Sequence, residues 1–345
     1  MPIINIFILT TASFLLSFIF TPLVTTVLYK YKLGKNIRSN GDTPVFTSLH
    51  EKKRGTPTMG GILVWATVLM LTGVIYFFAR WTGISWLKAL DISNRSETWL
   101  PLAALGCAAV VGLIDDIVDI HKAGKFGSGI RFRMKFLIYV LMALVGAWWF
   151  YVKLDWNVLR VPLFGTYEIG IWTIVLFLGV FIGTSFSVNE IDGLDGLAGG
   201  TLLAAFVAYG TIAFAQGRYD LAALCGMIVG ALLSFLWFNI PPARFFMGDT
   251  GAMSLGVTLG VIALLTNYAL LLPIIGLLFV IEALSVIIQL ISKKVFHKKV
   301  FICAPIHHHL EAKGWTESKI VMRFWIISAV TAVIGVVIAL MDIGR

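Results

Sequence analysis

Charge and cysteine are both scarce in this sequence. Asp, Glu, Lys and Arg together make up 13% of the 345 residues, about half of their usual share in soluble globular domains. The three cysteines, Cys107, Cys225 and Cys303, show neither the spacing of a disulfide framework nor that of a metal site. These shortages exclude a soluble enzyme, a disordered chain and a disulfide-stapled secreted domain.

Long hydrophobic runs take the place of charge. Hydrophobic residues make up 59% of the chain, and a helix that crosses a bilayer needs roughly 20 mostly apolar residues. The runs predict an all-α polytopic membrane protein with about ten transmembrane helices, built as a single integral-membrane domain over residues 1–345. The predicted helices span residues 4–29, 59–79, 98–114, 134–152, 169–187, 196–214, 220–238, 250–265, 269–291 and 322–343.

The distribution of basic residues predicts the orientation of the chain. Of the 27 lysines and arginines, 20 lie in one set of connecting segments and 7 in the other. Cytoplasmic loops of membrane proteins carry the excess of Lys and Arg, so we expect the richer set in the cytoplasm. An even number of spans then places both termini outside. The first run is interpreted as a retained helix, because further spans follow it instead of a cleavage site.

Three aspartates stand at predicted cytoplasmic helix ends. Asp115 and Asp116 close the third run in the sequence GLIDD, and Asp249 precedes the eighth run in FMGDTG. Adjacent carboxylates repel each other, so they need a cation or a shared proton. Mg²⁺ favours carboxylate oxygens together with waters and substrate phosphates. A solvated helix end for the pair and an N-cap role for Asp249 are the structural alternatives.

A second polar segment, VNEIDGLDGLAGG, follows the fifth run. Asn189, Asp192 and Asp195 recur every third residue, so in a helical turn they would share one face. Gly193 and Gly196 would let a ligand approach the main chain. A turn with capping acids is the alternative interpretation.

The last cytoplasmic segment contains CAPIHHHLEAKGW. Because His307, His308 and His309 are consecutive, they cannot easily all face one zinc ion, and we expect them to hold phosphate oxygens. The basic segment KKRGTPTMGG lacks P-loop spacing, and Phe246 offers an aromatic face for stacking. Together these features indicate Mg²⁺-assisted phosphoryl transfer between a lipid phosphate and an anionic nucleotide derivative at the cytoplasmic face.

These motifs resemble those of the polyprenyl-phosphate N-acetylhexosamine-1-phosphate transferases. The paired aspartates and NEIDGLDGLA are similar to motifs of the whole superfamily, whereas KKRGTPTMGG and APIHHHLEAKGW resemble the muramoyl-pentapeptide branch. The resemblance implies that UDP-N-acetylmuramoyl-pentapeptide and undecaprenyl phosphate react to give lipid I and UMP, with Mg²⁺ as cofactor. It also implies a multi-pass protein of the bacterial cytoplasmic membrane, in contact with membrane lipid and with no nucleic acid. It leaves a homodimer open.

The resemblance further assigns roles to individual residues. The residues that match the catalytic positions are Asp115, Asp116, Asp249, His307, His308 and His309, with Asp249 and Asp116 expected at the metal. The residues that match substrate-binding positions are Lys53, Thr58, Asn189, Asp192, Asp195, Asn239, Phe246 and Gln289. Phe246 is expected to stack on uracil.

Two segments depart from the family's usual pattern. Glu190 and Ile191 stand where the family usually has Leu and Thr. The loop after Asp119 reads HKAGKFGSGIRFRMKF in place of a form rich in lysine and asparagine. The roles of its lysines, Lys122, Lys125 and Lys135, are therefore left open.

Two other functions are alternatives to this interpretation of the motifs. A sister enzyme that uses UDP-N-acetylglucosamine would share the metal and lipid chemistry, and only KKRGTPTMGG and the three histidines argue against it. A secondary transporter would place Glu282 and Gln289 on its path. The transporter is disfavoured because the polar clusters lie at one predicted face of the membrane.

Overall fold

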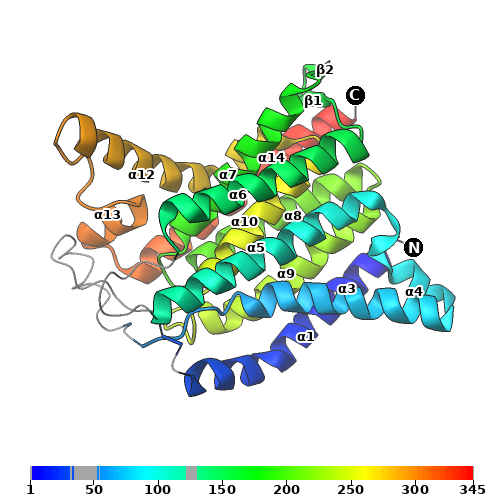
Figure 1. The fold of residues 1–345 in the computed structure, drawn as a ribbon, viewed down its shortest axis with the longest axis horizontal. Helices are drawn as coiled ribbons and strands as arrows, with labels where there is room; N and C mark the ends of the chain where they lie inside the picture. Colours follow the sequence, from blue (N-terminus) through cyan, green and yellow to red (C-terminus); the bar gives the residue numbers. More distant parts are fainter. Residues whose placement is uncertain (1, 32, 35–52, 54, 122–129, 345) are drawn as a thin grey trace.

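The computed structural model is a bundle of long helices with one small β-hairpin (Figure 1). It describes residues 2–31, 33–34, 53, 55–121 and 130–344. Four residues of the basic segments, Lys52, Arg54, Lys122 and Lys125, lie outside the described residues. The helices are α1 (Pro2–Lys30), α3 (Ile62–Thr82), α4 (Ser85–Leu90), α5 (Ser96–His121), α6 (Phe132–Trp148), α7 (Trp172–Ile191), α8 (Leu197–Ala215), α9 (Tyr219–Asn239), α10 (Gly248–Leu265), α11 (Leu272–Ile275), α12 (Leu277–Val295), α13 (Ile306–Ala312) and α14 (Glu317–Ile343). The remaining elements are η2 (Ile92–Asn94), the π-helical turn η3 (Trp149–Lys153), η4 (Ala269–Leu271), β1 (Val158–Val161) and β2 (Gly165–Glu168).

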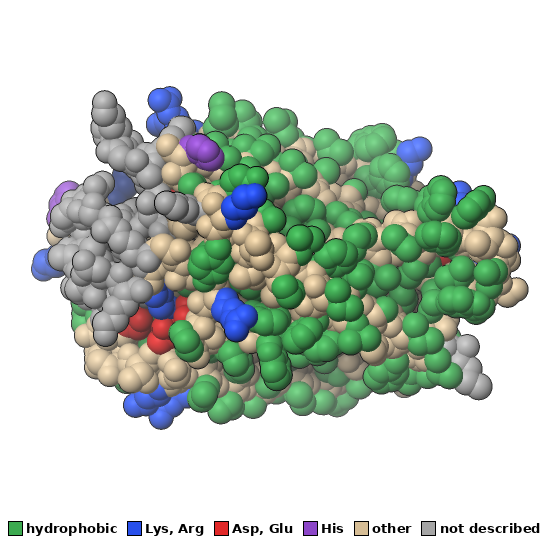
Figure 2. All heavy atoms as spheres, turned by 90° about the horizontal axis from the view of Figure 1, so that it is seen from below, with side chains coloured by type: hydrophobic (Ala, Val, Ile, Leu, Met, Phe, Trp, Pro, Cys, Tyr) green, Lys and Arg blue, Asp and Glu red, His purple; other side chains and the backbone are tan. Residues whose placement is uncertain are grey.

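Within the described residues, nine helices are long and apolar enough to cross a membrane. This confirms the helical, multi-span fold class predicted from the hydrophobic runs. Figure 2 shows hydrophobic side chains over most of one face of the molecule, as a surface in contact with lipid requires. The start of α1 and the end of α14 lie at the same end of the bundle (Figure 1).

The prediction of one continuous helix over residues 269–291 is wrong. The segments Ala269–Ile275 and Leu277–Val295 are long and apolar enough to cross a membrane when taken together, but they are bent by 82° where they meet. The break falls at Gly276, whose φ of −101° and ψ of 35° lie outside the helical range. Glycine is a poor helix former, so the chain turns here. Beyond the bend, α12 projects away from the bundle (Figure 1).

Helix α10 is the centre of the bundle. Of the residues in its 18-residue apolar stretch, 94% are buried. The helix packs against α3, α5, α7 and α8. The approach to α5 is so close that a Cβ added to Gly112 would lie 2.5 Å from the carbonyl oxygen of Asp249. Small residues permit such close packing of membrane helices. The first turn of α10, which carries Asp249, is thereby held against α5.

Helix α5 is longer than the sequence predicts. The predicted helix ends at residue 114, whereas α5 continues to His121. Asp115 and Asp116 therefore lie inside the helix and not at its C-terminus, and both are buried, with exposed fractions of 5% and 8%. Their partners, described below, come from other helices, and those partners allow the helix to continue through two carboxylates.

The hairpin of β1 and β2 was not predicted, because four-residue strands give no periodic signal beside long apolar runs. The strands are antiparallel, with Val158 opposite Glu168. Asp342 of α14 holds this hairpin: one carboxylate oxygen accepts from Nε of Arg160 at 2.5 Å and the other from the main-chain N–H of Leu163 at 2.9 Å. The hydroxyl of Tyr268 also donates to Asp342, at 2.7 Å. This cluster lies at the end of the bundle that holds both termini.

Candidate active site

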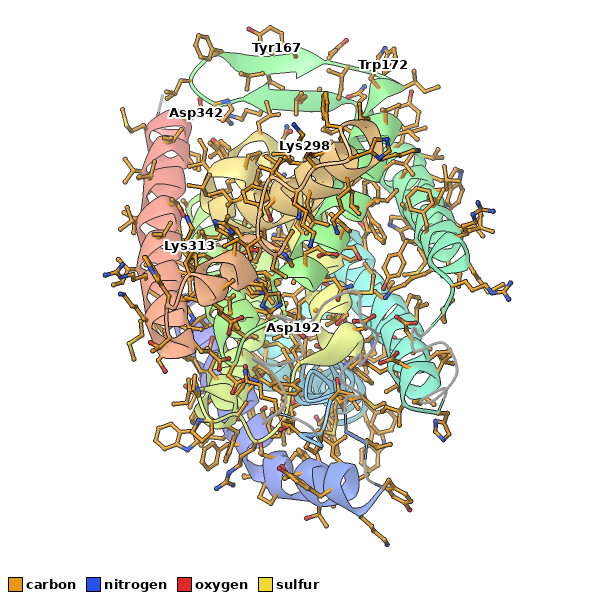
Figure 3. The ribbon with its side chains drawn as sticks, turned by 90° about the vertical axis from the view of Figure 1, so that its left-hand side faces the viewer. Tyr167, Trp172, Asp192, Lys298, Lys313 and Asp342 are labelled. Carbon is orange, nitrogen blue, oxygen red and sulfur yellow. The ribbon has the colours of Figure 1, made fainter. Side chains whose placement is uncertain are left out.

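The chemically functional residues singled out from the sequence gather at the other end of the bundle. Figure 3 looks onto this end, with Asp192 near the middle of the view. Lys298, which follows α12, and Lys313, which follows α13, are labelled in the same view. The site is assembled from the segment before α3, from α5 and α6, from the α7–α8 turn, from the start of α10 and from α12 to α14.

Asp115 and Asp249 are brought together by a lysine that the sequence left without a role. Nζ of Lys135, on α6, donates to Oδ2 of Asp115 and to Oδ2 of Asp249. The main-chain N–H of Ile130 donates to the other oxygen of Asp115. We call Asp115, Lys135 and Asp249 the carboxylate–lysine centre. Its three side chains are 7%, 15% and 23% exposed, so Asp249 is the most accessible member.

Asp116 makes a different set of contacts from its neighbour. Its Oδ1 accepts from the main-chain N–H of Asp249 at 3.1 Å, and its Oδ2 accepts from that of Thr250 at 3.0 Å. The first N–H groups of a helix have no partner within the helix, and negative charge is favourable at that end. Asp116 therefore caps α10 from α5 and fixes the main chain that carries Asp249. A metal role for Asp116 stays a prediction.

The prediction that Asn189, Asp192 and Asp195 share one helical face is wrong. Helix α7 ends at Ile191, and α8 begins only at Leu197. The residues between form a turn, in which an oxygen of Asp192 accepts from the N–H of Gly248 at 3.2 Å. Asp195 is directed elsewhere and accepts from the N–H of Ala243 at 3.0 Å. The alternative interpretation, a turn with capping acids, describes this segment better.

Gly193 has a role other than the expected one. A Cβ added there would lie 2.2 Å from Nε2 of His307, so the space beside Gly193 is filled by the imidazole and not left for a ligand. Gly196 has a φ of +81°, a left-handed conformation that side chains rarely adopt. Its N–H donates to Oδ1 of Asn239 at 3.0 Å, and Nδ2 of Asn239 donates to the carbonyl oxygen of Phe245 at 2.8 Å. Asn239 thus joins the α7–α8 turn to the segment that leads into α10.

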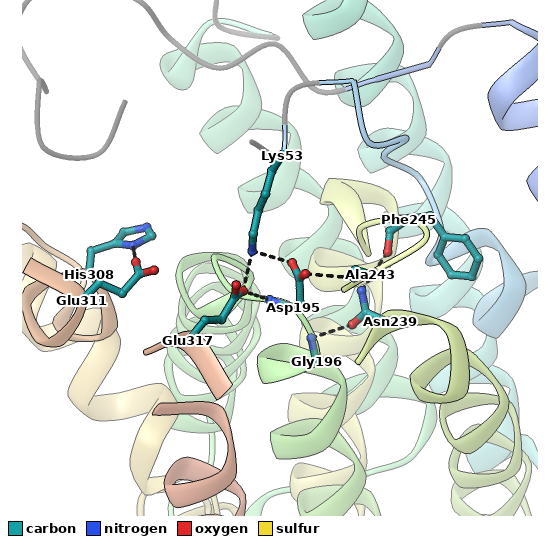
Figure 4. Close-up of polar contacts among 9 residues, drawn as sticks. All are labelled: Lys53, Asp195, Gly196, Asn239, Ala243, Phe245, His308, Glu311 and Glu317. Carbon is teal, nitrogen blue, oxygen red and sulfur yellow. Dashed lines mark hydrogen bonds and ion pairs between the residues drawn. The ribbon is translucent and has the colours of Figure 1, made fainter. Parts of the chain in front are cut away.

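Lys53 contacts two carboxylates in this region (Figure 4). Its Nζ donates to Oδ1 of Asp195 at 2.6 Å and to Oε1 of Glu317, the first residue of α14. The same ammonium lies 5.8 Å from the centre of the Phe246 ring. The segment around Thr58 is tied to the same place, because the N–H of Phe246 donates to the carbonyl oxygen of Pro57 at 2.8 Å. Lys53 and Phe246 therefore lie side by side, and their roles in substrate binding stay predictions.

Thr58 and Gln289 lie in different surroundings. Thr58 is buried, and within the described residues its hydroxyl has no hydrogen-bond partner. A Cβ added to Gly248 would lie 2.7 Å from that hydroxyl oxygen. Gln289 accepts from the N–H groups of Val300 and Phe301, both at 3.0 Å, and so braces the loop after α12. Thr58 is thus next to the start of α10, whereas Gln289 is tied to its own loop.

The three histidines take three separate partners, in keeping with the expectation that they do not face one ion. Nδ1 of His307 lies 3.0 Å from an oxygen of Glu282, and both side chains are fully buried. Nδ1 of His308 lies 2.7 Å from Glu311. His309 accepts from the N–H of Ile302 at 3.1 Å. Burial, with a smaller effect of Lys313, lowers the pKa of His309, which favours the neutral ring that this contact requires.

The donors present suit a hard divalent cation. Asp115 and Asp249 direct carboxylate oxygens at one positive group, and one or two carboxylates completed by phosphates and waters are the usual protein share of a Mg²⁺ site. Within the described part of the chain, no three His, Cys, Asp or Glu side chains gather as metal ligands. Two carboxylates thus converge at this point, and they would be the protein's share of such a site.

Two sequence patterns match this chain, both in the part that builds the site. The model for glycosyl transferase family 4 matches residues 98–267, and the phospho-N-acetylmuramoyl-pentapeptide-transferase signature 1 matches residues 53–63. The second of these contains Lys53 and Thr58, and the first contains the carboxylate–lysine centre and the α7–α8 turn.

Curated proteins match over nearly the whole chain. The phospho-N-acetylmuramoyl-pentapeptide-transferase of Geobacillus kaustophilus (strain HTA426) is 38% identical over 339 residues, which cover 98% of this chain and 99% of that protein. The protein of that name from Geobacillus thermodenitrificans (strain NG80-2) is 38% identical, with 94% and 95% covered. That from Chloroflexus aurantiacus (strain ATCC 29366 / DSM 635 / J-10-fl) is 37% identical, with 96% and 89% covered. The chain therefore belongs to the phospho-N-acetylmuramoyl-pentapeptide-transferase family.

Proposed function

We propose that this multi-pass membrane protein transfers phospho-N-acetylmuramoyl-pentapeptide from its UDP conjugate to undecaprenyl phosphate, giving lipid I and UMP. The observation that carries the proposal is the carboxylate–lysine centre, which joins Asp115, Lys135 and Asp249 from three helices in a chain of this family. Phosphoryl transfer depends on positioning and on neutralisation of charge. An ammonium between two carboxylates, one of them partly exposed, supplies both.

The site faces the cytoplasm in this proposal, and both termini lie outside. The support comes from the basic residues, of which 20 of 27 lie in the segments at the site's end of the predicted topology. The UDP conjugate is charged and water-soluble, so it reaches the site from the aqueous side. The lipid acceptor reaches the same site from the membrane. Pairing of two copies stays a prediction.

The reaction forms a bond between an oxygen of the lipid phosphate and the phosphorus that carries the sugar. It breaks the bond from that phosphorus to the oxygen that leaves with UMP. Asp115 orients the lipid phosphate or removes its remaining proton, and Lys135 holds Asp115 and Asp249 in register while balancing charge on the phosphates. Asp116 keeps the main chain at Asp249 in place.

Asp249 would be a ligand of Mg²⁺ in this proposal, and oxygens of the substrate diphosphate would complete the site. When bound, it neutralises negative charge that develops on the transferred phosphate. Lys135 donates to Asp249 in the structure, so the positive charge of the ammonium offsets part of the negative charge of that carboxylate. Metal dependence is tested directly by removal: with a chelator present, UMP release should fall to background, and added Mg²⁺ should restore it.

The function is tested with purified protein, undecaprenyl phosphate, Mg²⁺ and one nucleotide sugar at a time. With UDP-N-acetylmuramoyl-pentapeptide we expect UMP and a lipid product in equal amounts. With UDP-N-acetylglucosamine we expect neither. Equal turnover of UDP-N-acetylglucosamine would favour the sister enzyme, and movement of substrate across proteoliposomes without UMP would favour a transporter.

Phe246 is proposed to stack on the uracil ring. It directly precedes the segment that carries Asp249, so a base on its ring would bring the attached diphosphate toward the carboxylate–lysine centre. Base–aromatic stacking is worth roughly 1–3 kcal/mol per base. Phe246→Leu keeps apolar bulk but removes the aromatic face, so the KM for the UDP conjugate should rise by about tenfold to a hundredfold.

Thermal unfolding of Phe246→Leu serves as the control for packing. We expect the melting temperature to stay close to that of the unaltered protein, because Phe246 is only partly buried, whereas the neighbouring Phe245 is fully buried. An unchanged KM, or a loss of stability large enough to explain the whole defect, would assign Phe246 to packing alone.

A further inference from the structure

Glu317 contacts two residues of the site, Lys53 and Asp195, although neither the sequence motifs nor the resemblance singled it out. Its Oε1 accepts from Nζ of Lys53 and also from the main-chain N–H of Asp195, the latter at 2.7 Å. Lys53 donates in turn to Oδ1 of Asp195 at 2.6 Å. The three residues thus form a closed ring of hydrogen bonds, which we call the Lys53 ring (Figure 4).

The ring joins three segments that are distant in the sequence. Lys53 lies before α3, Asp195 in the α7–α8 turn and Glu317 at the start of α14, 264 residues after Lys53. The side chains of Lys53 and Glu317 are each 20% exposed and that of Asp195 is 6% exposed. Partial burial strengthens such charged hydrogen bonds relative to those in water, while the exposed part leaves Lys53 within reach of a solute.

Helix α14 contacts the α7–α8 turn through a second residue besides Glu317. Two helical turns further on, Nε1 of Trp325 donates to the carbonyl oxygen of Gly196 at 3.0 Å. Helix α14 therefore grips the α7–α8 turn at two points, the N–H of Asp195 and the carbonyl oxygen of Gly196. A carboxylate on a helix fixed in this way can define where a flexible lysine places its ammonium.

From these contacts we propose that Glu317 is a positioning residue for nucleotide binding, acting through Lys53. A free lysine side chain loses rotamer entropy when it is fixed, and its contact with Glu317 fixes Lys53 before the substrate arrives. The ammonium is held 5.8 Å from the Phe246 ring, beside the proposed place of the uracil base. The inference rests on the proposed function, because it names a residue that prepares the same site.

The discriminating variant is Glu317→Gln. Glutamine keeps an oxygen that can accept from the N–H of Asp195, but it removes the charge that holds Lys53. We expect the KM for UDP-N-acetylmuramoyl-pentapeptide to rise by about tenfold, which corresponds to the loss of one charge-assisted hydrogen bond. The kcat should stay within about twofold, because Glu317 does not touch the carboxylate–lysine centre. Glu317→Asp, which keeps the charge but shortens the reach, should give an intermediate KM.

A double-variant cycle tests whether Glu317 acts through Lys53. In a Lys53→Met background, adding Glu317→Gln should change the KM by less than about twofold. An equal rise in KM in both backgrounds would overturn the proposal, as would an unchanged or lowered KM in Glu317→Gln alone. A matched control is Glu168→Gln, an exposed glutamate on β2 outside the site, which should leave KM and kcat unchanged.

A failure of the Glu317 inference can be told apart from a failure of the proposed function. Release of UMP by the unaltered protein tests the function, whatever Glu317 does. Isothermal titration of UMP onto the folded variants gives a second readout that needs no turnover, and weaker binding by Glu317→Gln is expected there too. A variant with a lowered melting temperature but unaltered UMP affinity would show a purely structural role and would overturn the inference.

Discussion

Replacement of Asp249 by asparagine is expected to reduce UMP release by about a thousandfold or more, in line with the loss of a charge that organises phosphoryl transfer. The amide side chain would keep the shape of the aspartate but not the charge that contacts Lys135 and that is proposed to hold Mg²⁺. The measurement is initial velocity over a range of Mg²⁺ concentrations. Because the main-chain N–H at this position still donates to Asp116, the melting temperature should change little.

The result that contradicts this prediction is near-normal turnover of Asp249→Asn at ordinary Mg²⁺ concentration. Such a result would remove Asp249 from the centre of the mechanism. A rate that recovers only at much higher Mg²⁺ concentration would support the proposed metal role, because a weakened site is filled by mass action. Glu168→Gln, far from the site, again provides the control for handling of the protein.

The second large effect concerns the two adjacent aspartates, Asp115 and Asp116. From their different contacts we expect the asparagine variants to differ, one losing activity alone and the other losing activity and stability. Asp115→Asn should lower the rate by at least about a hundredfold, the lower end of general acid–base contributions. Its fold should persist, because the main-chain N–H of Ile130 can still donate to the amide oxygen. The test is kcat together with thermal unfolding in the same detergent.

Asp116→Asn should lose activity and stability together. Each oxygen of Asp116 accepts from one main-chain N–H at the start of α10, and an amide group can offer only one oxygen. One buried N–H is then left unpaired, at a cost of about 1–3 kcal/mol. If Asp115→Asn kept its rate while Asp116→Asn were inactive at full stability, the two roles would have to be exchanged.

The fold followed from the sequence where apolar length alone decides the structure. Nine predicted spans correspond to long helices, because a run of apolar residues has few other ways to satisfy its main chain in a membrane. The failures share a different cause. Gly276 bends a run that is apolar on both sides, and α5 continues past Asp115 because Lys135 and the N–H groups of α10 satisfy its acids.

The sequence indicated which residues lie at this end of the molecule, but it did not indicate which of them contact one another. Asp115 and Asp249 were expected at one face of the membrane, and the structure brings them to one lysine. The contact of Lys135 with Asp249 spans 114 residues and that of Glu317 with Lys53 spans 264, so no local pattern in the sequence predicts either contact. The available signal for Lys135 was its place in the basic sequence HKAGKFGSGIRFRMKF, shortly after the paired aspartates.

Separate partners also explain why the three consecutive histidines do not act as one group in the structure. The sequence groups His307, His308 and His309 by adjacency, whereas the fold separates them by side-chain direction on α13. His307 is turned inward to Glu282, a residue that sequence reasoning assigned only to a transporter path. Because Gly193 packs against His307, this buried pair supports the α7–α8 turn from behind. Their contribution to catalysis stays a prediction.

The Lys53 ring also has a consequence for the order in which the protein is made. Lys53 leaves the ribosome early, whereas Glu317 follows it by 264 residues, so the ring closes only when almost the entire chain has been synthesised. A chain that stops before α14 would already contain every aspartate of the site and yet lack the carboxylate that fixes Lys53. Loop closure over such a length is slow compared with local helix formation. A chain without α14 is therefore expected to bind nucleotide more weakly than the full chain, because Lys53 keeps Asp195 but loses its second carboxylate.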